Sequence, residues 1–306
     1  MKNGTCWLDD QGNLIQAHGG MIARFGDVWY WYGENKDADN TVVNGQVQRR
    51  IDVVGMSCYS SRDLLHWRHE GVVLPAVAQE GHPLHPKGVM ERPKVIYSEK
   101  TGKYVMWFHL DRADYTWAAA GCAVADRPQG PFTFLHAVVP NRRDCRDMTI
   151  YRDPTDGQNY LVHSGDWNKT LYFSQFTEDC TQFTGVCYSQ LPLQSREAPA
   201  LCYHDGLHYC VTSGCTGWDP NSALYAVAPR LCGNMALIDN PCEGPNYRRT
   251  FEGQSTYIFE AAGRFYLMLD HWKRYDLRHS GYSILPIDFS QGRMTIPWQE
   301  EFNGIE

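Results

Sequence analysis

Three acidic side chains in this 306-residue chain are each next to an arginine at the start of an apolar segment. They are Glu91, Asp147 and Glu197. Hydrolysis of a glycosidic bond needs a proton donor for the leaving oxygen and an opposing group that activates water or attacks directly, and both groups are usually carboxylates. Crowding these carboxylates in one pit would raise the pKa of one of them, so that a glutamate could donate a proton near neutral pH.

The acids and one amide have separable roles in such a reaction. Glu197 is our choice for the general acid, because the apolar residues Ala198-Pro199-Ala200 would exclude water from one side of its carboxyl group. The nearby charge of Asp147 would keep Glu197 protonated. Glu91 would bind sugar hydroxyls or bind and activate water. Gln254 is uncharged in its ordinary form and would position a ligand by hydrogen bonds. The plainer alternative for each acid is an ion pair or a turn cap with the adjacent arginine, which is Arg196, Arg146 or Arg92.

Aromatic side chains near the same segments could stack on a sugar, because the apolar faces of sugars pack on rings while their hydroxyls form hydrogen bonds around the edge. The candidates are Tyr115, Trp167, Trp218 and Trp272. Burial between neighbouring sheets explains each of them equally well. We expect His18 and His271 to be hydrogen-bonded structural residues, and no tight cluster of His, Asp and Glu predicts a transition-metal site.

The elements that would bring these residues together recur along the chain. A glycine turn followed by an aromatic, alternating strand occurs at five glycines, numbered 26, 102, 157, 206 and 263. Together with the abundance of Trp, Tyr, Gly and Pro, this repeat favours an all-β protein with short or absent helices. One repeat per 61 residues or so is enough for a four-stranded antiparallel sheet. We therefore predict a five-bladed β-propeller that forms one domain over residues 1–306, with a sandwich or β-helix as the alternatives.

Each repeat opens with a polar cluster about 8–11 residues before its glycine, directly ahead of an apolar run. If the apolar run is the innermost strand of a blade, all these clusters start at the same level around one axis. They would then converge at one mouth of the central channel. The clusters begin at Gln16, Glu91, Arg146, Arg196 and Glu252.

Composition excludes several classes of partner. The net charge of −7 gives no electrostatic reason to bind nucleic acid. No apolar stretch is long enough to cross a bilayer, and no export signal opens the chain. The 11 cysteines are odd in number and scattered, which indicates reduced and mostly buried thiols in a reducing compartment. We therefore expect a cytoplasmic protein, or a secreted or periplasmic one if the sequence is a trimmed mature form.

Several longer motifs are similar to those of a known family. They are Ile15–Gly20, Tyr30–Glu34, Glu91–Tyr97, Gly102–Trp107, Arg196–Ala200 and Ser213–Asn221. In this order they resemble glycoside hydrolase family 43, most closely its exo-β-1,3-galactanases, from about residue 7 to residue 290. The resemblance implies a five-bladed propeller, inversion at the anomeric carbon, and release of galactose from the non-reducing end of β-1,3-galactan, the backbone of arabinogalactan proteins.

The resemblance also implies roles for individual residues. Glu197 matches the general acid of the family, and Asp147 matches the aspartate that modulates its pKa. The general base of the wider family is an aspartate at the opening of the first blade, where this chain has Ala17-His18-Gly19. Gln254 matches a glutamine proposed to replace that base as an imidic acid, and Glu91 matches a glutamate needed for sugar binding or for base work. By similar position the expected sugar contacts are Glu34, Tyr115, Asn168, Thr216 and Trp218.

A normal amide is far too weak a base. Our hypothesis is that Gln254 holds the attacking water while Glu91 and its neighbours tune the surroundings. The expected partner is galactan or a galacto-oligosaccharide. No cofactor is expected, although related propellers sometimes hold calcium through water molecules in the channel.

The chain ends soon after the fifth repeat, without the appended carbohydrate-binding module of many relatives, so we expect a preference for short or released chains. The alternatives are an α-L-arabinofuranosidase, a β-xylosidase, or a propeller that binds sugar without catalysis.

Overall fold

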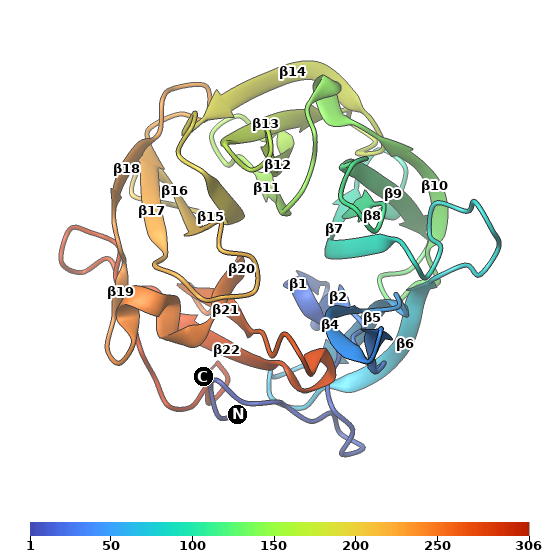
Figure 1. The fold of residues 1–306 in the computed structure, drawn as a ribbon. Coiled ribbons are helices and arrows are strands. Elements are labelled where there is room, and N and C mark those ends of the chain that lie inside the picture. Colours follow the sequence, from blue (N-terminus) through green and yellow to red (C-terminus); the bar gives the residue numbers. More distant parts are fainter. Residues whose placement is uncertain (306) are drawn as a thin grey trace.

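Five antiparallel sheets surround a central axis in the computed structural model, which describes residues 1–305 (Figure 1). The predicted five-bladed propeller is therefore confirmed. Blade 1 contains β1 (His18–Phe25), β2 (Val28–Glu34), β5 (Gly55–Ser61) and β6 (Arg68–Pro75). Blade 2 contains β7 (Val89–Ser98), β8 (Lys103–Asp111), β9 (Ala119–Ala125) and β10 (Thr133–Val138).

The remaining blades follow in chain order. Blade 3 contains β11 (Met148–Arg152), β12 (Asn159–Gly165), β13 (Thr170–Phe176) and β14 (Phe183–Gln190). Blade 4 contains β15 (Arg196–His204), β16 (Leu207–Gly214), β17 (Leu224–Ala228) and β18 (Ala236–Asp239). Blade 5 contains β20 (Gln254–Ala261), β21 (Arg264–His271) and β22 (Gly281–Pro286).

The other elements are short. A hairpin of β3 (Asn40–Val43) and β4 (Gln46–Ile51) is inserted in blade 1, and β19 (Cys242–Glu243) pairs in parallel with β23 (Ile296–Pro297). The 3-10 helices are η1 (Pro140–Arg142), η2 (Tyr247–Glu252) and η3 (Leu277–His279), so the prediction of short helices is confirmed. Within residues 1–305, no helix is long and apolar enough to cross a membrane.

The glycine repeat marks the first turn of every blade. Each of the five glycines connects the first strand of its blade to the second and adopts φ between +63° and +80°. This left-handed conformation costs glycine little because it has no Cβ. The first strands β1, β7, β11, β15 and β20 lie next to the axis (Figure 1), so the polar clusters that precede or open them converge as predicted.

Hydrophobic side chains fill the spaces between neighbouring blades. One cluster joins blades 1 and 5 through Trp29, Trp31 and Phe259, and another joins blades 2 and 3 through Trp107 and Phe176. The other three clusters join blades 1 and 2, 3 and 4, and 4 and 5. Seven of the 11 cysteines are buried, and all 11 are free thiols. The ring therefore has one core between each pair of neighbouring blades.

The N-terminal segment completes blade 5, which has three strands where the repeat predicted four. Tyr282 of β22 donates its backbone N–H to Thr5 at 3.0 Å and accepts from Gly4 at 2.8 Å. Asn3, which is buried, exchanges hydrogen bonds with the backbone of Ile284. The N-terminal segment therefore pairs with a strand from near the C-terminus, and this pairing closes the ring of blades. The two chain ends accordingly lie side by side at blade 5 (Figure 1).

Candidate active site

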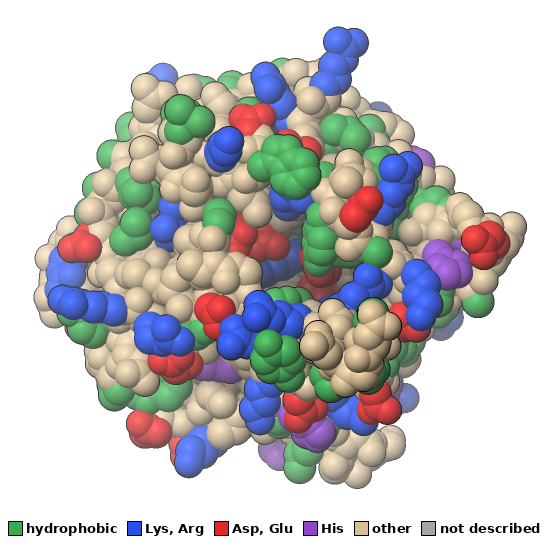
Figure 2. All heavy atoms as spheres, viewed as in Figure 1, with side chains coloured by type: hydrophobic (Ala, Val, Ile, Leu, Met, Phe, Trp, Pro, Cys, Tyr) green, Lys and Arg blue, Asp and Glu red, His purple; other side chains and the backbone are tan. Residues whose placement is uncertain are grey.

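A pocket of about 350 Å³ opens beside the axis on the face shown in Figure 2, where acidic and basic side chains gather around the hollow. All five blades contribute to its wall. It is lined by Glu34, Glu91, Arg92, His109, Tyr115, Arg146, Asp147, Asn168, Glu197, Gly217, Trp218, Gln254 and Trp272. The four predicted catalytic side chains are therefore together, and so are four of the five predicted sugar contacts.

Thr216 is the predicted sugar contact that does not line the pocket. It lies in the loop after β16, where its hydroxyl donates to the backbone oxygen of Asp219 and accepts from Asn221 Nδ2 at 2.7 Å. Among the aromatic candidates, Trp167 also lies outside, 65% exposed with the Arg146 guanidinium 4.3 Å from its ring centroid. The rings of Trp218 and Trp272 do line the pocket and meet edge to face at 5.1 Å.

Bulges in the inner strands aim the acids into the pocket. The pairing register shifts between Glu91 and Lys94 in β7 and between Glu197 and Ala200 in β15. The residue after each glutamate is left-handed, with φ of +56° at Arg92 and +52° at Ala198. A bulge turns the strand locally and re-aims a side chain. Glu91 and Arg92 can therefore both line the pocket, although successive residues in a regular strand point to opposite faces.

Glu197 is 8% exposed and held by two amides. Asn168 Nδ2 donates to its Oε2 at 3.1 Å, and Gln254 Nε2 donates to its Oε1 at 3.2 Å. Burial and then the charge of Asp147 raise the pKa of Glu197 to about 8, against the lowering effect of Arg92. This carboxyl can therefore remain protonated at neutral pH.

Arg92, rather than the arginine adjacent in sequence, is the partner of Asp147. Its guanidinium lies 3.0 Å from Asp147 Oδ2 and donates to Gln254 Oε1 at 2.6 Å. Arg146, the arginine next to Asp147, instead lies 3.3 Å from Asp144 Oδ2 and donates to the backbone oxygen of Tyr115 at 3.2 Å. Arg196, which is next to Glu197, donates to the hydroxyl and the backbone oxygen of Thr212. The bulge at Arg92 explains why Asp147 pairs with this arginine, because the bulge directs the Arg92 guanidinium across the axis.

The amide of Gln254 has all its hydrogen-bonding capacity in use. Its Oε1 accepts from Arg92 and, at 3.0 Å, from Trp272 Nε1, while its Nε2 donates to Glu197 and, at 3.0 Å, to Ser213 Oγ. Arg and Trp side chains can only donate, which fixes the oxygen on their side. A proton on that oxygen, as an imidic acid requires, would face two N–H donors.

Glu91 accepts hydrogen bonds from the Tyr115 hydroxyl at 2.9 Å and from His109 Nδ1, which lies 3.2 Å away. Burial acts to raise the pKa of Glu91, but the hydrogen bond and charge of His109, with Lys36 and Tyr115, lower it to about 2. Sequence reasoning missed His109, since the only available signal was its alternation with Asp111 on one face of a strand.

The opening of blade 1 provides no carboxylate to the pocket, and His18 is fully buried beside it. Its Nδ1 lies 3.1 Å from Asp270 Oδ1 and its Nε2 lies 3.0 Å from the Tyr282 hydroxyl. His271 contacts Ser283 Oγ at 2.7 Å. Both histidines are hydrogen-bonded structural residues, as predicted.

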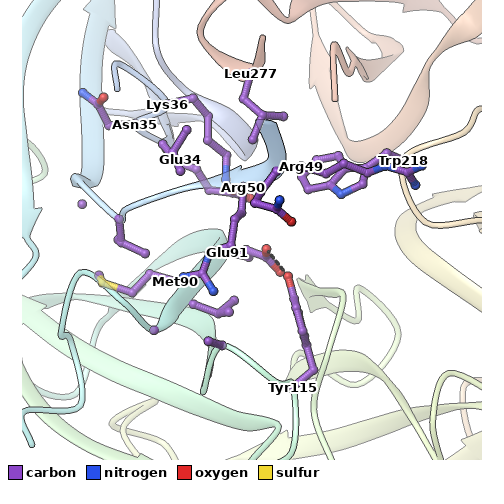
Figure 3. A pocket seen from close by; sticks show the side chains of 17 residues that line it. Glu34, Asn35, Lys36, Arg49, Arg50, Met90, Glu91, Tyr115, Trp218 and Leu277 are labelled. Atoms are coloured by element: carbon purple, nitrogen blue, oxygen red, sulfur yellow. Dashed lines mark hydrogen bonds and ion pairs between the residues drawn. The ribbon is translucent and has the colours of Figure 1, made fainter. Parts of the chain in front are cut away.

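A second pocket of about 230 Å³ adjoins the first and shares Glu34, Glu91, Tyr115 and Trp218 with it. Figure 3 shows Glu91 turned toward the Tyr115 hydroxyl, with Lys36 beside Glu34. The Lys36 ammonium lies 2.6 Å from Glu34 Oε2. Within residues 1–305, no group of three or more His, Cys, Asp or Glu side chains is arranged to hold a metal ion.

This arrangement can perform acid catalysis on a ligand held at the axis. Glu197 is a buried carboxyl with a raised pKa beside the Asp147–Arg92 ion pair, and the aromatic rings of Trp218, Trp272 and Tyr115 offer surfaces for a sugar. Of the other acids in the wall, Glu91 is an ionised acceptor, and Glu34 is paired with Lys36. Such a division between a protonated and an ionised carboxyl is the pattern of glycoside hydrolysis.

Comparisons with known proteins agree with this chemistry. The sequence profile of glycosyl hydrolases family 43 matches residues 21–281. A family 43 β-1,3-galactosidase solved with galactodeoxynojirimycin is 34% identical with a TM-score of 0.90, and the match covers 99% of this chain and 100% of that one. No match was found among curated proteins.

Two exo-β-1,3-galactanases have similar structures. A variant of the Phanerochaete chrysosporium enzyme solved with β-1,3-galactotriose is 31% identical with a TM-score of 0.87, and the match covers 97% of this chain and 66% of that one. The Clostridium thermocellum enzyme is 31% identical with a TM-score of 0.85, with coverage of 97% and 65%. The predicted resemblance is thereby confirmed, and the chain is a glycoside hydrolase that belongs to family 43.

Proposed function

We propose that this protein releases galactose from the non-reducing end of β-1,3-galactan or β-1,3-linked galacto-oligosaccharides, with inversion at the anomeric carbon. The observation that carries the proposal is Glu197, a buried carboxyl whose pKa is raised to about 8 in a pocket at the propeller axis. The β-1,3-galactan specificity is supported by the similar proteins of known structure, which are β-1,3-galactosidases and exo-β-1,3-galactanases.

Exo action is supported by the shape of the pocket. Side chains from all five blades line it around the axis. An endo-acting enzyme needs a groove that lets the polymer continue in both directions. A pocket at the axis instead admits the end of a chain, and the terminal sugar would lie between the rings of Trp218, Trp272 and Tyr115.

Inversion is supported by the lack of a free carboxylate for covalent attack. Asp147 is paired with Arg92 at 3.0 Å, Glu34 is paired with Lys36 at 2.6 Å, and Glu91 accepts from Tyr115 and His109. Glu197 would protonate the leaving oxygen while a water attacks the anomeric carbon from the other face. A single displacement by water inverts that carbon. Each step of the proposed reaction uses side chains and water.

In the proposed reaction, the side chain of Gln254 binds and orients the attacking water. Because all four hydrogen-bonding positions of the Gln254 amide are occupied within the protein, binding of the water by Gln254 requires it to release one partner. The neutral hydroxyl of Ser213 is the partner most easily replaced by water, since the others include a guanidinium and the general acid. Glu91, whose side chain is 20% exposed, would then complete the polar surroundings.

The proposal is tested by product analysis on galactobioses of defined linkage. The β-1,3-linked disaccharide should be converted to galactose, whereas the β-1,4- and β-1,6-linked isomers, xylobiose and arabinobiose should remain. Glu197→Gln should abolish the conversion, and the matched surface variant Glu80→Gln should retain it, because Glu80 is exposed and does not line the pocket. Cleavage of a pentose disaccharide instead of the galactobiose would contradict the proposal.

A further inference from the structure

His109 lies buried between two carboxylates, behind the wall of the pocket. Its side chain is 1% exposed, its Nδ1 lies 3.2 Å from Glu91 Oε2, and its Nε2 lies 3.1 Å from Asp111 Oδ2. An ionised carboxylate can only accept hydrogen bonds, so both ring nitrogens must carry a proton to make both contacts. The geometry therefore requires His109 to be an imidazolium.

The balance of charges around the ring agrees with this assignment. Lys36 is paired with Glu34 at 2.6 Å, and Arg146 lies 3.3 Å from Asp144 and 4.0 Å from Asp111. Tyr115, the remaining titratable group in contact with Glu91, donates a neutral hydroxyl. Among residues 1–305, His109 is the only side chain that forms an ion pair with Glu91. The imidazolium is thus the direct counter-charge of this carboxylate.

Asp111 anchors the ring from behind. One of its carboxylate oxygens accepts from the backbone N–H groups of Arg112 and Trp117, each at 2.8 Å, while the other faces His109. Burial opposes a charge on His109, but its hydrogen bonds to Asp111 and Glu91 raise its pKa to about 9. Because Asp111 and His109 are two residues apart in β8, they lie on the same face of the strand and keep a fixed relation.

We propose that Asp111 and His109 form a positioning pair for Glu91. The pair holds the Glu91 side chain in one orientation and keeps it ionised, so that the terminal sugar meets a fixed anionic acceptor. This inference rests on the proposed function, because it takes the ligand in the pocket to be the terminal sugar of a galactan. Loss of the imidazolium leaves the partly buried Glu91 without its counter-charge. A buried carboxyl in that position binds a proton at higher pH and ceases to be an anionic acceptor.

The charge on His109 can be tested without any substrate. In the wild-type protein with 15N-labelled histidine, the ring signals absent from His109→Gln report this residue. Both ring nitrogens should remain protonated from pH 5 to about pH 8, well above the ordinary histidine pKa of about 6.5. A ring that is neutral at pH 7.5 would overturn the proposal.

The effect on Glu91 is tested by the pH dependence of kcat/KM on β-1,3-galactobiose. His109→Gln retains one amide donor but carries no charge, so the acidic limb of its profile should move to higher pH by about one unit or more. Its KM at pH 5 should rise about tenfold, as expected for loss of a charge-assisted hydrogen bond. Asp111→Asn should move the limb in the same direction, and the surface variant His66→Gln should match the wild type.

A purely structural role for His109 predicts a different result. In that case His109→Gln would have a lower kcat and a higher KM by the same factors at every pH, while the acidic limb of its kcat/KM profile stayed in place. This result would overturn the proposal. Galactose binding measured calorimetrically between pH 4 and pH 8 separates this failure from a failure of the proposed function. If the wild type keeps its galactose binding to lower pH than His109→Gln does, but leaves β-1,3-galactobiose intact, the positioning pair is supported and the proposed function is rejected.

Discussion

Glu197 is the residue on which the proposed reaction depends, because it is the buried carboxyl of the pocket with a pKa raised to about 8. General acid catalysis contributes roughly 10²–10⁴-fold to a rate. Glu197→Gln should therefore lower kcat on β-1,3-galactobiose by at least about 100-fold. A galactoside with a dinitrophenyl leaving group needs no protonation, so the variant should lose far less activity on it. Equal losses on both substrates would show that Glu197 is not the proton donor.

The pH profile should follow the protonation of Glu197. A general acid works only while it carries its proton, so kcat/KM should fall as pH rises through about 8. The charge of Asp147 contributes to this raised pKa, so Asp147→Asn should move the alkaline limb to lower pH by about one unit. The exposed variant Asp10→Asn is the control. An alkaline limb that stays in place in Asp147→Asn would separate Asp147 from the acid.

The contributions of Gln254 and Glu91 can be separated by two substitutions. If Gln254 holds the water and aligns Glu197, Gln254→Ala should lower kcat by roughly 100-fold with a small change in KM. Glu91→Gln, which retains the shape of an acceptor, should act mainly on KM. Steady-state kinetics on β-1,3-galactobiose provide both values. Near wild-type turnover in Gln254→Ala together with loss of turnover in Glu91→Gln would identify Glu91 as the base.

Sequence reasoning could find the acids but not their partners. Glu91, Asp147 and Glu197 were predictable because each opens a repeat at an equivalent place, and repetition brings such places together. Each was also next to an arginine in sequence, yet the ion pair of Asp147 is with Arg92 from another blade. The contact of Glu91 with His109 likewise depends on a strand bulge, and no local pattern reports where a bulge occurs.

At the scale of the element, the turn glycines made the strands predictable. The close approach of the β1 and β2 backbones in blade 1 was not visible in the sequence. A Cβ added at Gly20 of β1 would lie 1.6 Å from the backbone oxygen of Tyr32 in β2. Gly20→Ala should therefore destabilise the protein by about 1–3 kcal/mol or more, since β1 and β2 must separate. Urea denaturation measures the change, with Gly233→Ala as the control because its nearest atom is 3.3 Å away. Equal stability of the two variants would contradict the packing described for this blade.

The whole molecule is a closed ring with one hydrophobic core between each pair of neighbouring blades. Five repeats predicted this closure, but not that the N-terminal segment would take the outer position in blade 5. That contact joins residues separated by most of the chain, so no repeat or local motif could have revealed it. The pocket depends on the closure because all five blades line it.

Asn3 tests the closure directly. Its side chain donates to Gln299 O at 2.9 Å and accepts from Ile284 N at 3.0 Å, and it is 3% exposed. Asn3→Ala leaves the buried backbone N–H of Ile284 without its partner and should destabilise the protein by about 1–3 kcal/mol in urea denaturation. The exposed Asn13→Ala should have little effect. Unchanged stability in Asn3→Ala would mean that the ring closes without this segment.

The central claim is that the axial pocket releases terminal galactose in one inverting step. It is tested most directly by proton NMR of the anomeric signals while the protein acts on β-1,3-galactobiose, with Glu197→Gln as the control. The proposed mechanism predicts that α-galactose forms first and equilibrates to the β form, and that the variant forms neither. Early β-galactose would contradict inversion and the roles assigned to Gln254 and Glu91, and a persistent lack of galactose would contradict the proposed function itself.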